Sequence, residues 1–310
     1  MRNTFSNELY RIAKKNKKIY IIAADISPAG SMEKFRSENP DRFINVGVAE
    51  QVMIGVCAGL SMRGKMPFAY TIATFALYRP FEMIRDDLAY QNLPVTIVGM
   101  GAGTIYSNLG GTHVTQEDIS IAKSIPNMSI IAPSDCLELK EAIKYCTNNK
   151  HGPIYLRIGK SGEKDFTKKS KEKWSFGKIR KIKDGKKVCI LTYGPIISIA
   201  SSVIEELELR KINPSLYSCH TLKPFDQKRM KKIFKNYDLI VTIEDHSIVN
   251  GLTSDVKSLA YDNDFRGDIL GFSLKDKFFH TYEKQQDLLD LHGINKRTIV
   301  KKILSKLNEK

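Results

Sequence analysis

An acid and a histidine occupy positions where α/β proteins commonly place chemistry. Glu50 stands at the start of a predicted helix, 50–63, that is apolar on most sides. His113 follows Gly110-Gly111-Thr112 in a glycine-rich stretch, 99–115, that lacks helix or strand periodicity. A buried carboxyl group can hold a proton, and a loop histidine can exchange one near neutral pH. The long glycine-rich loop therefore suggests a functional site at the edge of a sheet, where open α/β folds bind ligands.

Each feature also has a structural explanation. A carboxylate at a helix N-terminus is stabilised by the helix dipole, and a single loop histidine is usually polar surface. Against the first explanation, an ionised acid at the start of a nearly apolar helix is unfavourable without a partner. The run from Gly99 to Gly103 suggests a dinucleotide site, but Thr104 takes the position of the last glycine in the G-x-G-x-x-G pattern.

Short apolar runs alternate with amphipathic stretches along the chain, which is typical of parallel sheets covered by helices on both faces. We therefore predict two three-layer α/β domains with largely parallel sheets, 1–162 and 188–310, joined by a charged linker, 163–187. First-half strands are predicted at 18–24, 42–46, 67–71, 95–99, 128–132 and 153–158, with helices at 50–63, 78–91, 116–123 and 135–146. Second-half strands are predicted at 188–193, 215–219, 239–243 and 269–272, with helices at 196–210, 251–261 and 294–307.

The formal net charge of +15 is concentrated in the linker, 163–187, which holds 11 Lys or Arg and 4 Asp or Glu. A solvated linker explains this charge best. A nucleic-acid-binding patch is the alternative, although only Trp174 and Phe176 interleave with the basic residues. The five cysteines are scattered without a C-x-x-C, and no apolar run approaches the roughly 20 residues of a membrane helix. We therefore expect a cytoplasmic protein with reduced thiols that binds no metal of its own, no nucleic acid and no membrane.

A series of further motifs resembles those of transketolase-type thiamine-diphosphate enzymes. The first half resembles their pyrimidine-binding domain, and the second half their C-terminal domain. The first-half motifs are Asn45 to Gln51, Thr74-Phe75, Arg85 to Tyr90, Gly111-Thr112-His113, Ile125 to Met128 and Ala132 to Asp135, and the second-half motifs are Leu222 to Asp226, Ile243 to His246 and Gly251-Leu252. Because they follow the family order over nearly the whole chain, the combination is more specific than any single motif.

The resemblance implies that five residues contact the cofactor. Glu50 matches the acid that hydrogen-bonds N1′ of the aminopyrimidine and favours the tautomer that removes the C2 proton of the thiazolium ring. An apolar site would favour the protonated form of this acid. Phe75 matches the aromatic residue that stacks on the pyrimidine. Asp25 matches an acid near the cofactor, with a turn cap as its structural alternative. Ile72, which stands where many family members carry an aromatic residue, and Tyr78 are expected to complete the contacts.

The resemblance also implies four residues at the substrate. His113 matches a histidine near the substrate carbonyl, suited to proton transfer or to hydrogen bonding of a developing alkoxide. Lys160 stands where the family places a phosphate-binding arginine, with Arg157 three residues earlier; a basic cluster that opens the linker is the alternative. Leu109 replaces an acid that contacts an acceptor hydroxyl in the family. This departure suggests a deoxy or otherwise modified sugar as the substrate.

The sequence lacks the Gly-Asp-Gly motif with a distant Asn that holds Mg²⁺ and the diphosphate in this family. We therefore expect a separate N-terminal subunit to supply both, in an α2β2 assembly with the site between subunits. The expected reaction transfers a two-carbon ketol unit from a ketose to an aldehyde. Two related activities are alternatives: the beta chain of a 2-oxo-acid dehydrogenase decarboxylating component, and a 1-deoxyxylulose-phosphate-synthase-like enzyme.

Overall fold

The computed structural model describes residues 1–27, 29–160 and 162–309, and two sheets organise this part of the chain. The first sheet has seven described strands in the order β10-β5-β6-β4-β3-β1-β2. Neighbouring strands are parallel except for β10, which pairs antiparallel with β5. The strands are β1 (Ile19–Ala23), β2 (Phe43–Asn45), β3 (Met66–Ile72), β4 (Thr96–Met100), β5 (Ser129–Ile131), β6 (Ile154–Ile158) and β10 (Thr221–Lys223).

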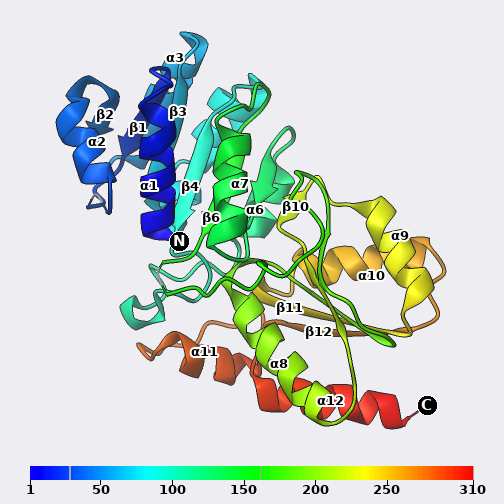
Figure 1. The fold of residues 1–310 in the computed structure, drawn as a ribbon. Coiled ribbons are helices and arrows are strands. Elements are labelled where there is room, and N and C mark those ends of the chain that lie inside the picture. Colours follow the sequence, from blue (N-terminus) through cyan, green and yellow to red (C-terminus); the bar gives the residue numbers. More distant parts are fainter. Residues whose placement is uncertain (28, 161, 310) are drawn as a thin grey trace.

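Helices cover both faces of the first sheet, as the alternating pattern predicts (Figure 1). On one face, α1 and α7 bury Phe5 and Leu139 in a cluster with Tyr70 of β3. On the other face, α3 and α6 bury Met53 and Ile119. The helices of this half are α1 (Arg2–Ala13), α2 (Met32–Glu38), α3 (Glu50–Met62), α4 (Ala73–Leu77), α5 (Phe81–Met83), α6 (Asp118–Ser124) and α7 (Cys136–Cys146).

The second sheet has five described strands in the order β12-β11-β8-β9-β7, parallel except for β7 against β9. Helices α8 and α12 lie on one face, and α9 and α10 lie on the other (Figure 1). The strands are β7 (Arg180–Lys183), β8 (Val188–Thr192), β9 (Ser215–Ser218), β11 (Leu239–Ser247) and β12 (Asp268–Leu274). The helices are α8 (Ile197–Leu209), α9 (Gln227–Asn236), α10 (Leu252–Asp262), α11 (Gln285–His292) and α12 (Lys296–Asn308).

The two halves of the molecule share an apolar interior. One buried cluster joins Ile97 and Tyr155 of the first sheet to Leu191 and Tyr217 of the second. Strand β10 belongs to the second half in sequence, yet it extends the first sheet through its pairing with β5. Residues far apart in sequence can therefore meet where the two halves touch.

The region after β3 differs from the prediction of one helix at 78–91. After α4 ends at Leu77, the structure has a turn, α5 and a π-helical segment, Ile84–Tyr90, in place of that helix. Pro80 precedes α5, and because it has no backbone N–H it interrupts α-helical hydrogen bonding there. The predicted loop 99–115 lacks long helices or strands and contains one short 3₁₀ turn, Ser107–Leu109.

The segment predicted as a solvated linker contains ordered structure. Strand β7 joins the second sheet by pairing with β9. Trp174 stacks on the buried His220 with ring centroids 4.9 Å apart, and Phe176 stacks on Tyr145 at 4.2 Å. These aromatic residues anchor the segment, while its lysines 168, 169, 171 and 173 are exposed. The exact domain limits that we assign from the sequence stay predictions.

Arg157 of β6 forms a buried ion pair within the first half and a hydrogen bond to the second half. Arg157 donates from Nε to Asp118 Oδ2 at 2.7 Å and from Nη2 to the backbone carbonyl of Asp245 in β11 at 2.8 Å. The Tyr155 hydroxyl also donates to Asp118 Oδ2, at 2.8 Å. The side chains of Arg157 and Asp118 are 3% and 0% exposed, so neither charge has bulk water to compensate it.

Arg157→Met should therefore lower the free energy of unfolding by about 3–5 kcal/mol, because it leaves the Asp118 carboxylate buried without its cation. Arg85→Met is the control, since the Arg85 side chain is 60% exposed and pairs with its neighbour Asp86. That change should cost less than about 1 kcal/mol. Urea unfolding followed by circular dichroism measures both variants. Equally small losses would mean that Arg157 does not compensate Asp118.

Candidate functional site

The carboxyl ends of parallel strands bring the predicted cofactor residues to one edge of the first sheet. Asp25 follows β1, Ile72 ends β3, and Glu50 follows the turn after β2. Asn45 at the end of β2 holds this turn, since its Oδ1 accepts from the Gly47 N–H at 3.0 Å and from the Asp25 N–H at 3.3 Å. Asp25 is exposed, with φ of 40°, and Ile72 is half-buried.

Glu50 is a buried carboxylate at the first position of α3. Its side chain is 3% exposed, and Arg79 Nη1 donates to Oε1 at 2.8 Å and to Oε2 at 3.1 Å. The helix N-terminus also favours a negative charge at this position. The sequence led us to expect an apolar surrounding for this acid, and the structure places the Arg79 guanidinium against both of its oxygens.

Aromatic rings continue from Glu50 toward the glycine-rich loop. The Arg79 guanidinium carbon lies 4.3 Å from the centroid of the Phe75 ring, so the cation that bonds Glu50 also covers this ring. The His113 ring meets Phe75 edge-on, with centroids 5.2 Å apart, and meets Tyr106 at 6.3 Å. The Lys160 ammonium lies 4.8 Å from the Tyr106 centroid. Glu50, Phe75, His113 and Lys160 therefore belong to one row of contacts.

His113 is fixed in this row by hydrogen bonds within its own loop. Its Nδ1 lies 2.9 Å from the Thr112 hydroxyl, and its backbone N–H donates to the Gly110 carbonyl at 3.0 Å. Partial burial lowers the pKa of His113 from its usual value, and the positive charge of Arg79 lowers this pKa further. A neutral imidazole can accept a proton or donate a hydrogen bond, as a substrate carbonyl would require.

The structure gives a different environment to each of the three predicted residues Arg157, Tyr78 and Leu109. The guanidinium of Arg157 is buried and paired with Asp118, so the structure does not bring it to this row for phosphate binding. The Tyr78 hydroxyl donates to Glu117 Oε2 at 2.8 Å, and burial raises the pKa of this hydroxyl. The Leu109 side chain is 45% exposed at the end of the 3₁₀ turn.

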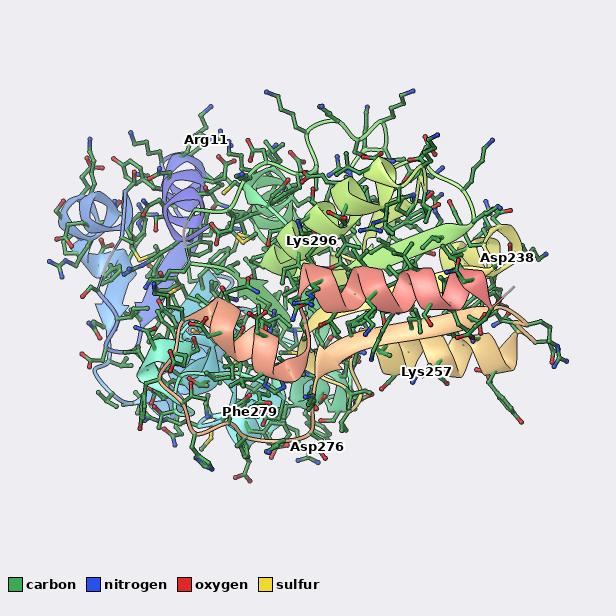
Figure 2. The ribbon with its side chains drawn as sticks, turned by 90° about the horizontal axis from the view of Figure 1, so that it is seen from below. Arg11, Asp238, Lys257, Asp276, Phe279 and Lys296 are labelled. Atoms are coloured by element: carbon green, nitrogen blue, oxygen red, sulfur yellow. The ribbon has the colours of Figure 1, made fainter. Side chains whose placement is uncertain are left out.

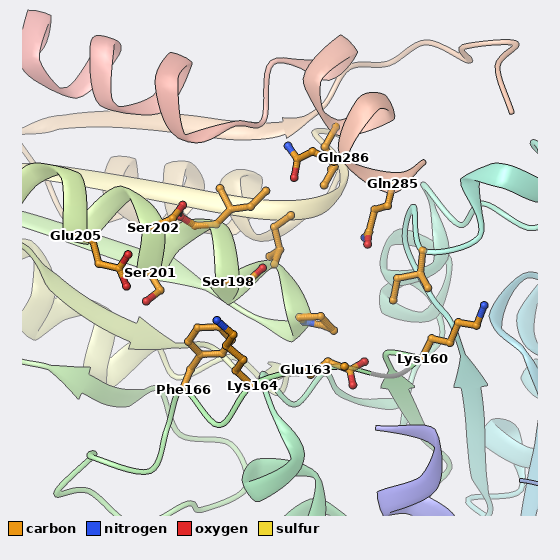
Figure 3. A pocket seen from close by; sticks show the side chains of 16 residues that line it. Lys160, Glu163, Lys164, Phe166, Ser198, Ser201, Ser202, Glu205, Gln285 and Gln286 are labelled. Atoms are coloured by element: carbon orange, nitrogen blue, oxygen red, sulfur yellow. Dashed lines mark hydrogen bonds between the residues drawn. The ribbon is translucent and has the colours of Figure 1, made fainter. Parts of the chain in front are cut away.

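A cavity of about 450 Å³ lies between the two halves beside Lys160 (Figure 3). Lys164, Ser198 and Gln285 line it, and α8 begins at its wall. Lys160 stands at the rim and extends away from the other labelled residues in Figure 3. The ammonium of Lys160 therefore belongs to the row of rings rather than to this cavity.

The second half of the chain holds the glycine-rich loop in place. The Thr104 N–H donates to Asp245 Oδ2 at 3.0 Å and to Oδ1 at 3.1 Å. The Ser107 hydroxyl donates to the Glu283 carbonyl at 2.8 Å, within the segment between β12 and α11 that carries Phe279 (Figure 2). Gly110 has φ of 77°, and a Cβ there would lie 2.7 Å from the Tyr282 ring, so only glycine suits this position.

Two residues of the row were missing from the sequence-based set. Arg79 stands four positions after Phe75, a spacing that places two side chains on one helical face. This spacing is the one signal that could have identified it. Tyr106 carried no motif, because its place beside His113 depends on the course of the loop.

The residues around Glu50 fit the aminopyrimidine of thiamine diphosphate. They offer a buried carboxylate that accepts hydrogen bonds and an aromatic ring covered by a flat group, the Arg79 guanidinium. A flat heterocycle that carries a hydrogen-bond donor, such as an aminopyrimidine, would need the same two partners: an acceptor for its donor and an aromatic ring to stack on. The described residues include no cluster of three His, Cys, Asp or Glu side chains able to hold a metal ion.

The fold and the sequence together define the class of protein. The pattern of the transketolase pyrimidine-binding domain matches residues 1–162, and that of the transketolase C-terminal domain matches residues 177–299. The chain therefore belongs to the transketolase family and is a transferase subunit. Family membership implies thiamine diphosphate as the cofactor. Among the described residues, no helix is both long and apolar enough to cross a bilayer.

Individual relatives agree with this assignment. A protein of Methanocaldococcus jannaschii, assigned as a transketolase C-terminal section, is 33% identical over 310 residues, which cover 100% of this chain and 96% of that protein. The 6-deoxy-6-sulfo-D-fructose transketolase subunit of Clostridium sp. strain MSTE9 is 34% identical, covering 82% of this chain and 78% of that subunit. A split-gene transketolase, solved as an inactive β4 tetramer, superposes with a TM-score of 0.88 at 30% identity, covering 99% and 98% of the two chains.

A 1-deoxy-D-xylulose-5-phosphate synthase from Caldanaerobacter subterraneus is also similar. It is 31% identical over 99% of this chain, but the match spans only 49% of the synthase. The split transketolase subunits match along most of their own length, so they support the main assignment better than the synthase does.

The His113 imidazole should titrate below pH 6.5, because burial and Arg79 both disfavour its protonated form. The unfolded chain binds this proton near pH 6.5, so His113 should reduce stability as the pH falls below that value. Arg79→Met should raise the pKa, whereas Arg85→Met should leave it unchanged. NMR titration of the histidine ring signals measures the value. An unshifted wild-type pKa would show that His113 is solvated in solution.

Proposed function

We propose that this chain is the pyrimidine-binding half of a two-subunit transketolase. The assembled enzyme transfers a two-carbon ketol unit from a ketose to an aldehyde. The observation that carries the proposal is the buried Glu50 carboxylate beside the Phe75 ring, at the carboxyl edge of the first sheet. An acid that is 3% exposed is costly to keep in a fold, which supports a chemical role.

Glu50, Phe75 and Ile72 would hold the aminopyrimidine of the cofactor. When bound, thiamine diphosphate supplies an electron sink for breaking and forming carbon–carbon bonds. Glu50 would share a proton with N1′ of the pyrimidine, and Phe75 would stack on its face. Asp25 follows the neighbouring strand at the same edge and would complete the polar rim. Tyr78 would support the site through its bond to Glu117.

His113 and Lys160 would serve the substrate. His113 lies against Phe75 and would pass a proton to or from the substrate oxygen. Lys160 would bind a substrate phosphate as a point charge, because its ammonium rests on the Tyr106 ring with no carboxylate within ion-pair distance among the described residues. Arg157 takes no part in this proposal, because its charge is paired inside the protein.

A partner subunit would complete the site. We infer that it binds the diphosphate and Mg²⁺, since the sequence lacks the motif that does so in the family. Self-association would use an exposed apolar stripe formed by α3 and by Val48, two residues before the helix begins. Val48, Val52 and Met62 are 65%, 54% and 59% exposed. Gly55 and Gly59 of α3 lie between Val52 and Met62 in sequence, and a Cβ added to either glycine would have no neighbour within 4 Å. The β4 form of the similar split-gene transketolase supports such contacts between copies.

Other assignments have less support. The synthase alternative rests on relatives that are about twice as long as this chain. The 2-oxo-acid dehydrogenase alternative has no observation of its own, and the exposed lysines of the segment 163–187 are the only support for nucleic-acid binding. The five cysteine thiols, all free in the structure, suit the reducing cytoplasm that we propose as the location.

Glu50→Gln should abolish turnover in the assembled complex without unfolding it. Gln keeps the shape of the side chain but cannot share a proton with N1′, so the expected loss is at least about 10²–10⁴-fold in kcat. Glu82→Gln is the control, because Glu82 is an exposed acid of α5. The assay uses saturating thiamine diphosphate and Mg²⁺. Activity of Glu50→Gln within threefold of wild type would refute the proposed role.

We further propose that the substrate is a deoxy or otherwise modified sugar. Leu109 offers no hydrogen bond where the family resemblance suggests an acid for an acceptor hydroxyl, and burying an unpaired hydroxyl is unfavourable by roughly 1–3 kcal/mol. The relative that acts on a 6-deoxy-6-sulfo sugar supports a modified substrate. The exposed position of Leu109 leaves room for such a contact.

Leu109→Asp should raise kcat/KM for a hydroxylated aldehyde phosphate relative to its deoxy counterpart by about tenfold, the equivalent of one new hydrogen bond. Asn108→Asp is the matched control, because it adds the same charge to the adjacent exposed residue. The measurement compares kcat/KM for the two aldehydes in all three proteins. A wild type that already prefers the hydroxylated aldehyde, with no gain in Leu109→Asp, would remove Leu109 from the acceptor site.

A further inference from the structure

Arg79 occupies the space between the two residues that we assign to the cofactor. Its Nη1 donates to both oxygens of Glu50, at 2.8 and 3.1 Å, and its guanidinium carbon lies 4.3 Å from the Phe75 centroid. A single flat, hydrogen-bond-donating group therefore touches the acid and covers the ring. These are the same two contacts that the proposed function requires of an aminopyrimidine.

The charge of Glu50 explains why Arg79 lies there. The Glu50 carboxylate is 3% exposed, and an ionised acid so far from water needs a cation or several donors. Arg79 supplies both, because guanidinium is always charged and presents its donors in a plane. Without another occupant, the pair stabilises the site in this closed arrangement.

Arg79 is also able to leave. Its side chain is 41% exposed, whereas that of Glu50 is 3% exposed, so the arginine reaches in from the surface. Withdrawal of a long side chain into solvent requires rotamer changes and no backbone movement. A donor that replaces Arg79 at the carboxylate would compensate Glu50 in its place.

We propose that Arg79 is a built-in occupant of the pyrimidine site that the cofactor must displace. This inference rests on the proposed function, since it assumes that Glu50 and Phe75 receive the aminopyrimidine. The consequence is a competition: only the fraction of molecules with Arg79 withdrawn can bind, so the apparent affinity for thiamine diphosphate falls by that fraction. Removing Arg79 should therefore tighten cofactor binding.

The first experiment measures binding to the assembled complex. Thiamine diphosphate with Mg²⁺ is titrated into wild type, Arg79→Met and Arg85→Met by calorimetry. Arg79→Met should lower the Kd by about tenfold, because every molecule becomes competent to bind. Arg85→Met should match wild type, since Arg85 pairs with Asp86 on the exposed surface. An unchanged Kd for Arg79→Met would overturn the proposal. A higher Kd would also overturn it, because it would show that Arg79 assists cofactor binding.

The second experiment tests the ion pair itself, without cofactor or activity. A double-mutant cycle combines Arg79→Met with Glu50→Gln in the isolated chain and measures thermal unfolding. The proposal predicts coupling, so that the double variant loses less stability than the two single changes predict. Purely additive losses would mean that Arg79 does not occupy the site in solution. If the pair is coupled but wild-type complex binds no thiamine diphosphate, the proposed function fails, and the displacement proposal fails with it.

Discussion

The buried carboxylate of Glu50 is the constraint on which the rest of the site depends. The carboxylate is 3% exposed, and its position at the first turn of α3 stabilises it only in part. A donor must therefore stand opposite it. In this structure Arg79 provides that donor, and Phe75 provides the flat surface on which the guanidinium rests. The site is consequently shaped for a planar, hydrogen-bonding group whether Arg79 or a cofactor fills it.

The second half of the chain shapes the same site from a distance. The Asp245 carboxylate accepts a hydrogen bond from the Thr104 N–H, and the Glu283 carbonyl accepts one from the Ser107 hydroxyl. The Tyr282 ring lies against Gly110. All three contacts fall on the loop that carries His113. Arg157, which is paired with Asp118 in the first half, links the two halves by donating to the Asp245 carbonyl of β11. The loop therefore owes its conformation to packing between the halves, since its own glycines leave the backbone free.

Much of this architecture could be predicted from the sequence, for reasons that also explain the failures. Buried parallel strands such as β1 and β8 are continuous apolar runs, so their positions were predictable. Glu50, Phe75 and His113 were identified from their motifs, and the structure brings them together. Arg79 escaped notice because a surface arginine has many ordinary explanations. Arg157 seemed available for phosphate because sequence spacing does not reveal a buried partner 39 residues away. The packing of Trp174 on His220 and of Phe176 on Tyr145 was not predicted, because charge dominated their segment.

The most direct test of the account is calorimetric titration of thiamine diphosphate with Mg²⁺ into this chain alone and into its complex with the N-terminal subunit. The isolated chain carries the residues that we propose for the pyrimidine but lacks the diphosphate motif, and charged contacts dominate the binding of such an anion. The account predicts weak or undetectable binding to the isolated chain and Mg²⁺-dependent binding to the complex. Micromolar, Mg²⁺-dependent binding by the isolated chain would contradict the division of the site between two subunits.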